Sequence, residues 1–246
     1  MINIKFIKDA KINGAILIEG LPGVGLVGPM TVSYIIDKIG MEYIGYIESE
    51  EFPPLVSIHA GIPMPPVRLY YSHEKQIVAL FSEFAIPMHI VNQLAERIYG
   101  MFKANNMQSI ISIGGIPANE EAGEDTVYAI GSTKESVKDA SKYGLSLITE
   151  GVSTGVGAVL LFKASVENVP DINILIPVNP AIINPRYAET AIKSINKILS
   201  LDIDISELEK EVKEVDTKIR SLIKKSNDTQ DAHKKAVNPE GPSMYG

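Results

Sequence analysis

Three glycines ahead of a helical pattern form the motif with the clearest capacity to bind a ligand. Gly23, Gly25 and Gly28 match G-x-G-x-x-G, and Glu48 lies 20 residues beyond the last of them. In a dinucleotide site this spacing brings backbone N–H groups to the pyrophosphate, and the acidic residue holds the ribose. Here three residues separate the preceding apolar segment from the first glycine, and one of them, Pro22, has no N–H. We therefore favour a structural glycine turn that permits close helix–sheet packing, and we expect no cofactor.

The other polar residues form no recognised catalytic or metal-binding pattern. No two of the four histidines stand at ligand spacing, and the chain has no cysteine, so we expect no metal site and no thiol nucleophile; the histidines are His59, His73, His89 and His233. The acidic groups at 48–51 and 120–125 could supply a general base, but charged loops are the favoured interpretation. The segment GVSTGVG at 151–157 could hold a phosphate, although no lysine follows it, and packing is favoured. These absences weigh against an enzyme.

The C-terminal end has an unusual composition. From residue 226 the apolar residues nearly disappear, which is typical of a flexible tail, yet the chain closes with Met244, Tyr245 and Gly246. Such an end offers a thioether, an aromatic ring and a terminal carboxylate. A partner pocket with a lysine and an apolar slot could hold all three groups. Composition alone leaves open whether this end is a docking motif or an ordinary disordered terminus.

Composition and charge limit the classes of protein. The chain has 246 residues, of which 45% are hydrophobic, so it can form one large core. Its net charge of −7 argues against a nucleic-acid partner, because binding to phosphates requires a basic surface. No apolar run approaches the roughly 20 residues that span a bilayer, and the N-terminus lacks the pattern of a signal peptide. We expect a cytoplasmic protein with no membrane contact.

Apolar runs and helical patterns alternate through the first 203 residues. They predict an α/β core domain with a mixed, largely parallel sheet covered by helices on both faces. Gly114 is expected to end one strand, and Ser132 to cap one helix. The predicted strands cover 15–19, 43–47, 55–59, 67–72, 76–82, 109–113, 126–130 and 172–177, with a hairpin between the fourth and fifth. The predicted helices cover 27–39, 87–103, 134–143, 155–164 and 185–199.

The pattern changes at residue 204. Residues 204–225 predict an amphipathic helix in which Asp204 and Glu207 form a capping-box-like pair. Its apolar residues step by three and four, and they could contact either the parent domain or another subunit: Ile205, Leu208, Val212, Val215, Ile219 and Leu222. Residues 226–246 form the predicted tail. The sequence thus divides into a core at 1–203, a helix and a tail.

Several of these segments together resemble the proteasome assembly chaperone (PAC) family. The resemblance rests on GLPGVGLVG at 20–28, GM at 40–41, ESEEFPP at 48–54 and IGG at 113–115, and on EG at 150–151, GVG at 155–157, NPR at 184–186 and DISEL at 204–208. It extends from about residue 15 to residue 209. It implies a core similar to that of nucleoside phosphorylases without their catalysis, and a glycine turn with no known nucleotide. The form of the chain is similar to that of archaeal homologues.

The resemblance also implies a partner. A terminal hydrophobic-Tyr-X motif in archaeal members docks between neighbouring α subunits of the proteasome core particle, and Met244, Tyr245 and Gly246 match that motif. The carboxylate of Gly246 would then pair with a pocket lysine. Several tails on a homo-oligomer would bind repeated pockets of the α ring together. Two alternatives stay open: an enzyme that binds a nucleoside or nucleotide and uses Glu48 or Glu50, and an adaptor whose tail docks on another protein.

Overall fold

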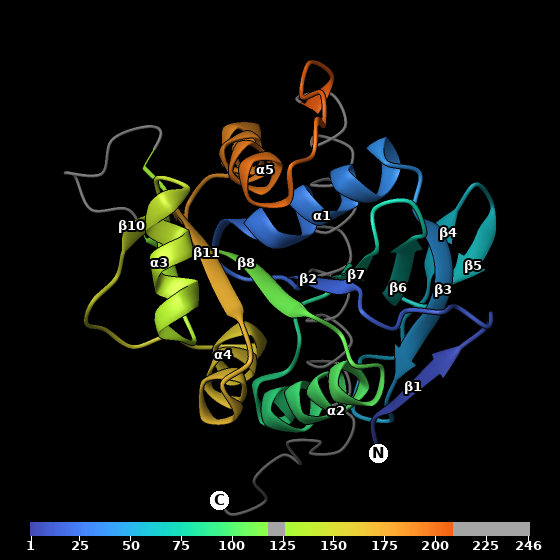
Figure 1. The fold of residues 1–246 in the computed structure, drawn as a ribbon. Coiled ribbons are helices and arrows are strands. Elements are labelled where there is room, and N and C mark those ends of the chain that lie inside the picture. Colours follow the sequence, from blue (N-terminus) through green and yellow to red (C-terminus); the bar gives the residue numbers. More distant parts are fainter. Residues whose placement is uncertain (118–125, 209–246) are drawn as a thin grey trace, which may run out of the picture.

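A nine-stranded sheet forms the centre of the computed structural model, which describes residues 1–117 and 126–208 (Figure 1). The strands in order across the sheet are β1 (Asn3–Phe6), β3 (Glu42–Glu48), β6 (Val67–Ser72), β7 (Ile77–Ser82), β2 (Ile16–Gly20), β8 (Ser109–Pro117), β11 (Asp171–Val178), β9 (Tyr128–Gly131) and β10 (Ser146–Leu147). A separate pair consists of β4 (Ser57–His59) and β5 (Ile62–Met64).

The sheet is mixed, as predicted. Its four central strands, β7, β2, β8 and β11, run parallel to one another. Antiparallel pairs join β1, β3, β6 and β7 on one side and β11 to β9 on the other. The connection from β7 to β8 passes through a helix, as parallel strands require, whereas β6 and β7 form the predicted hairpin.

Helices cover both faces of the sheet. The helices and short 3-10 turns are η1 (Val24–Leu26), α1 (Val27–Lys38), η2 (Met88–Ile90), α2 (Val91–Ala104), α3 (Lys134–Lys142), α4 (Val156–Glu167) and α5 (Pro185–Leu199). Helices α1 and α5 pack together on one face, and α2 and α4 pack together on the other (Figure 1). None of these helices, within the described ranges, is long and apolar enough to cross a membrane.

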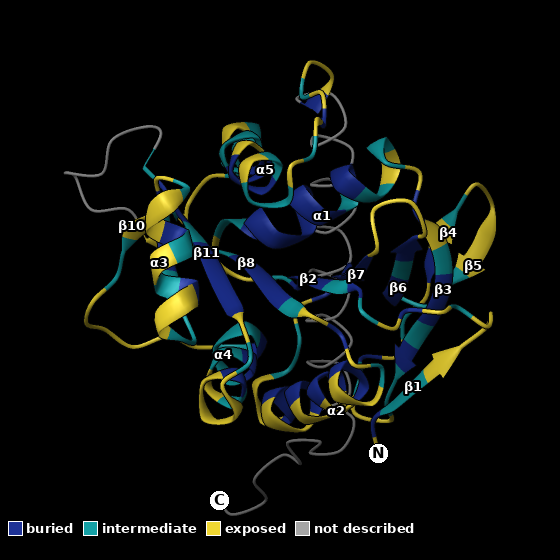
Figure 2. Ribbon diagram, in the orientation of Figure 1, coloured by how far each residue is buried: buried dark blue, intermediate teal, exposed yellow. Residues whose placement is uncertain are grey.

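Each face of the sheet has its own apolar core. Successive strand residues point to opposite faces, so Leu17 belongs to the cluster under α2 and α4, while Ile18 belongs to the cluster under α1 and α5. The central strands are therefore buried on both sides, and all six residues of β7 are buried (Figure 2). This double burial explains why their sequences are continuous apolar runs.

Some predicted boundaries were wrong. Strand β8 continues through Gly114 to Pro117, because β11 pairs with it along that whole length. Thr133, not Ser132, caps α3: its hydroxyl accepts a hydrogen bond from the Ser136 N–H at 3.0 Å. The edge strand β1 was not predicted, and it pairs with β3 about 40 residues further along the chain.

The segment after α5 lies against α1. The Tyr34 hydroxyl donates to the Asp204 carbonyl at 2.7 Å, and the Lys38 ammonium pairs with Glu207 at 2.7 Å. The Asp204 carboxylate accepts from the N–H and the hydroxyl of Ser206.

The first two residues of the predicted apolar seam contact the core of this chain. Leu208 is 3% exposed within the cluster under α1 and α5, and Ile205 packs against the same cluster. The rest of the seam, Val212, Val215, Ile219 and Leu222, lies outside the described residues.

Candidate functional site

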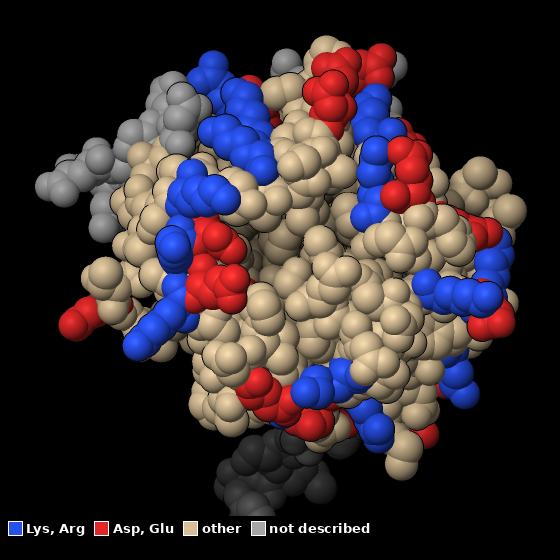
Figure 3. Space-filling view, viewed as in Figure 1, with Lys and Arg blue, Asp and Glu red and all other residues tan. Residues whose placement is uncertain are grey.

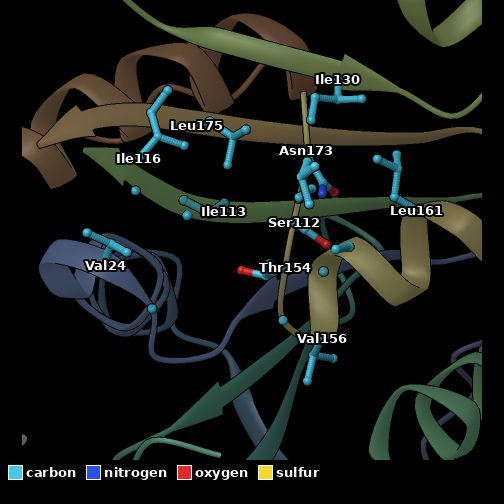
Figure 4. A pocket seen from close by; sticks show the side chains of 18 of the residues that line it. Val24, Ser112, Ile113, Ile116, Ile130, Thr154, Val156, Leu161, Asn173 and Leu175 are labelled. Carbon is cyan, nitrogen blue, oxygen red and sulfur yellow. The ribbon is translucent and has the colours of Figure 1, made fainter. Parts of the chain in front are cut away.

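A cleft of about 740 Å³ lies toward the C-terminal ends of β2 and β8 (Figure 4). Three glycine-bearing segments that the sequence analysis treated separately meet around it: the turn after β2, Gly114 and Gly115 in β8, and the segment before α4. Its size falls within the usual range for small-molecule sites. On the face shown in Figure 3, Lys, Arg, Asp and Glu lie mainly toward the periphery.

The glycine turn packs directly on β8. Gly25 has a φ of +68°, in the left-handed region that favours glycine. A Cβ on Gly28 would lie 2.7 Å from the Ile113 carbonyl oxygen, and one on Gly115 would lie 2.2 Å from the Val24 carbonyl oxygen. Gly23 has open space around its missing Cβ. At Gly28 and Gly115 the missing side chains therefore let two backbones approach closely.

Glu48 lies away from the glycine turn. Strands β6 and β7 separate β3, which ends at Glu48, from β2. The Glu48 carboxylate is 3.7 Å from the Lys5 ammonium, and neither Glu48 nor Glu50 lines the cleft. A dinucleotide site holds the ribose between the glycine turn after one strand and the end of the neighbouring strand. Here β2 and β3 are not neighbours, so this structure lacks the geometry of a dinucleotide site.

The floor of the cleft contains a buried carboxyl group that the sequence analysis did not select. Glu19, in β2, is 4% exposed, and burial raises its pKa to about 7. The Leu21 N–H, which donates to Glu19 Oε1 at 2.9 Å, opposes that rise in pKa, and so does the nearby Ser112 hydroxyl. Glu19 thus exists in both protonation states near neutral pH.

A second buried carboxyl group lies in β11. Asp171 is fully buried, and burial, together with the nearby charge of Glu19, raises its pKa well above the ordinary value. Asn173, two residues further along the same strand, is 3% exposed and lines the cleft. Polar residues at alternate positions of an otherwise apolar strand, as in DINILIPV, were the sequence signal that could have identified both.

The described histidines each pair with a glutamate. His59 Nε2 is 3.1 Å from Glu83 Oε1, whose other neighbour at 3.2 Å is the buried Arg68 guanidinium. His73 pairs with Glu42 and His89 with Glu51, while His233 lies outside the described residues. Within residues 1–117 and 126–208, no group of three or more His, Cys, Asp or Glu side chains could hold a metal ion.

The predicted docking residues, Met244, Tyr245 and Gly246, also lie outside the described residues.

The described fold is that of a mixed α/β protein whose glycine turns surround a cleft at the ends of the central parallel strands. Residues 17–223 match the PAC2 family, and the chain belongs to that family. The resemblance that the motifs indicated is thereby confirmed.

The similar proteins extend over nearly the whole chain. An uncharacterized protein of Methanocaldococcus jannaschii is 33% identical over 222 residues, which are 89% of this chain and 91% of that protein. The crystal structure of Pyrococcus furiosus PbaA, described as an archaeal homolog of proteasome-assembly chaperone, is 27% identical with a TM-score of 0.79, and the match covers 94% of this chain and 100% of PbaA.

A second Pyrococcus furiosus structure supports the fold. PbaB, described as an archaeal proteasome activator, is 21% identical with a TM-score of 0.75, and the match covers 90% of this chain and 98% of PbaB.

Proposed function

We propose that this protein is a non-catalytic, cytoplasmic assembly chaperone or activator-like factor of an archaeal proteasome. Membership of the PAC2 family carries this proposal. The similarity to PbaA supports it, because the match extends over the whole length of a homolog of proteasome-assembly chaperone. In this proposal the α ring of the proteasome core particle is the partner.

The proposed contact is the C-terminal motif Met244, Tyr245 and Gly246. The Gly246 carboxylate pairs with a lysine of the partner, and the Tyr245 ring and the Met244 thioether fill the adjoining apolar cleft. One short peptide buries little surface, so its affinity alone is weak. A homo-oligomer that presents several tails to a ring of repeated pockets gains avidity by effective concentration.

Contacts near the end of the described chain support this arrangement. Tyr34 and Lys38 of α1 hold Asp204 and Glu207, and Leu208 is buried against the core. The described chain is therefore held, up to residue 208, on the α1 side of the sheet. We propose that residues 204–225 form the connecting helix and that its later apolar residues contact another subunit.

The test is surface plasmon resonance on immobilised α rings with the full chain and three variants. Deleting residues 244–246 removes the whole motif, and Tyr245→Ala removes only the ring. Ser243→Ala is the matched control, because it changes the neighbouring residue and leaves the motif intact. We expect the deletion and Tyr245→Ala to weaken binding more than about tenfold, as loss of an aromatic anchor does, and the control to change it less than twofold.

Two outcomes would contradict parts of the proposal. If the deletion binds α rings as tightly as the full chain, the tail is not the contact, although the core could still be. If the full chain does not bind α rings in native mass spectrometry, the α ring is not the partner. A pull-down that depends on Tyr245 but recovers a different protein would favour the adaptor alternative.

The alternative of a nucleoside enzyme receives little support from the geometry. Glu48 and Glu50, its candidate bases, do not line the cleft. No lysine or arginine is present among the described residues that do line it, so no basic side chain there could pair with a phosphate.

A further inference from the structure

A row of polar side chains crosses the floor of the cleft on three neighbouring strands. The register aligns Glu19 of β2 with Ser112 of β8, and Ser112 with Asn173 of β11. Partners in adjacent strands are about 5 Å apart, so the three side chains form one continuous polar strip. All three line the cleft, and each is at most 4% exposed. Figure 4 shows Ser112 and Asn173 on neighbouring strands.

Several buried polar atoms of this strip have no hydrogen-bond partner in the described part of the chain; the Ser112 hydroxyl is one of them, and it can donate only one hydrogen bond. Asn173 Oδ1 is buried and accepts no hydrogen bond within the described part of the chain, and neither do the two carboxylate oxygens of Asp171 beneath it. Glu19 Oε1 accepts only from the Leu21 N–H. Buried acceptors without donors cost free energy, so this floor is complementary to a ligand that brings N–H groups.

The start of α4 lies close to the carboxyl group. Gly157 lies in the first turn of α4, and a Cβ on it would be 3.0 Å from Glu19 Oε2. The positive end of the α4 dipole therefore faces a carboxyl group of this chain. A bound anion would have to lie beside that carboxyl group, so this helix terminus does not form an anion site.

The charge of the cleft also favours a cation. None of the described lining residues is lysine or arginine, and the buried acidic one is Glu19. Glu150 also lines the cleft, but it is exposed and water screens its charge. The walls are apolar and include Leu21, Ile113 and Leu175. A ligand that matches both the acidic floor and the apolar walls has a positively charged donor group and an apolar body.

We propose that the cleft binds a small organic ammonium ion, whose N–H groups donate to Glu19 and Asn173 while its apolar body contacts the walls. Glu19 and Asn173 lie two strands apart, on either side of Ser112. In the proposed complex one N–H group of a primary ammonium donates to the Glu19 carboxylate, and a second N–H group is directed across Ser112 toward Asn173. The site goes beyond the proposed proteasome function, and it does not depend on the C-terminal tail.

Isothermal titration calorimetry on the full chain tests this proposal with three probes of one shape. 2-Phenylethylamine carries the ammonium group, 2-phenylethanol replaces it with a neutral hydroxyl, and 3-phenylpropanoate replaces it with a carboxylate. We expect the amine to bind with a Kd below 1 mM and at least about tenfold more tightly than the alcohol, because hydrogen bonds to charged groups are the stronger ones. The carboxylate should not bind measurably.

Two variants locate the site, and one is a control. Glu19→Gln keeps the shape of the side chain and removes the charge, and Asn173→Leu removes the amide oxygen; each should weaken amine binding about tenfold or more. Glu150→Gln removes an exposed charge at the same cleft and should change the affinity less than threefold. Circular dichroism spectra of each variant establish that it is folded.

The proposal is overturned if the amine and the alcohol bind equally, if the carboxylate binds more tightly, or if none of the probes binds at 5 mM. Amine binding that survives both Glu19→Gln and Asn173→Leu would place the ammonium elsewhere. If a variant is unfolded, the amine is titrated into the wild-type protein and amide chemical shifts are measured instead. Shift changes at Gly114 and Gly157 support binding in the cleft, and the absence of such changes on saturation refutes the proposal.

Discussion

Replacing Glu19 with glutamine measures how a buried carboxyl group affects folding. The carboxyl pKa is about 7 in the folded protein and 4.5 in an exposed side chain. The folded state therefore binds the proton more tightly than the unfolded state between these values. It follows that the free energy of unfolding falls as the pH rises from about 4.5 to about 7. This direction is opposite to that of a carboxylate in a salt bridge.

The magnitude follows from the difference between the two pKa values. At about 1.4 kcal/mol for each pH unit, the ionised Glu19 costs the folded state about 3 kcal/mol above pH 7. The glutamine variant has no such cost, so it should be more stable than the wild type by up to about 3 kcal/mol at pH 8 and similar to it at pH 5. Asp171 keeps a raised pKa in the variant, so part of the pH dependence should persist.

Urea unfolding followed by circular dichroism at pH 5, 6, 7 and 8 provides the measurement, since the chain has no tryptophan to report by fluorescence. Glu150→Gln is the control, because Glu150 is exposed at the same cleft and should leave the pH profile unchanged. If the wild type and Glu19→Gln lose stability in parallel between pH 5 and 8, the burial of Glu19 has no energetic effect and the reasoning is wrong.

Two further pairs of substitutions test the packing by urea unfolding. Gly28→Ala should destabilise the fold by about 2 kcal/mol or more, because the new Cβ would lie 2.7 Å from a β8 carbonyl oxygen. Gly100→Ala, whose Cβ would have no atom within 4 Å, should instead stabilise α2 by about 0.5–1 kcal/mol. Equal effects at the two glycines would refute the close packing of the turn. Arg68→Met should cost about 3–5 kcal/mol by leaving Glu83 buried without its arginine, and adding Glu83→Gln should restore part of that loss. A double variant no more stable than Arg68→Met would contradict this pairing.

The sequence alone determined the elements that depend on local signals. Helix α5 begins at Pro185 and ends at Leu199 as predicted, because proline favours the first turn and the apolar spacing sets its buried face. The hairpin of β6 and β7 also agrees, since its short turn joins two apolar runs. The motifs indicated the family correctly, and the C-terminal docking motif remains a prediction from the sequence.

The tertiary structure alone decided which distant residues meet. The order of the strands places β6 and β7 between β3 and β2 and so keeps Glu48 away from the glycine turn. The register of three parallel strands aligns Glu19 with Ser112 and Asn173, although these residues belong to three segments far apart in the sequence. Strand order and register depend on contacts between segments far apart in the chain. The pattern within any one segment therefore did not contain them.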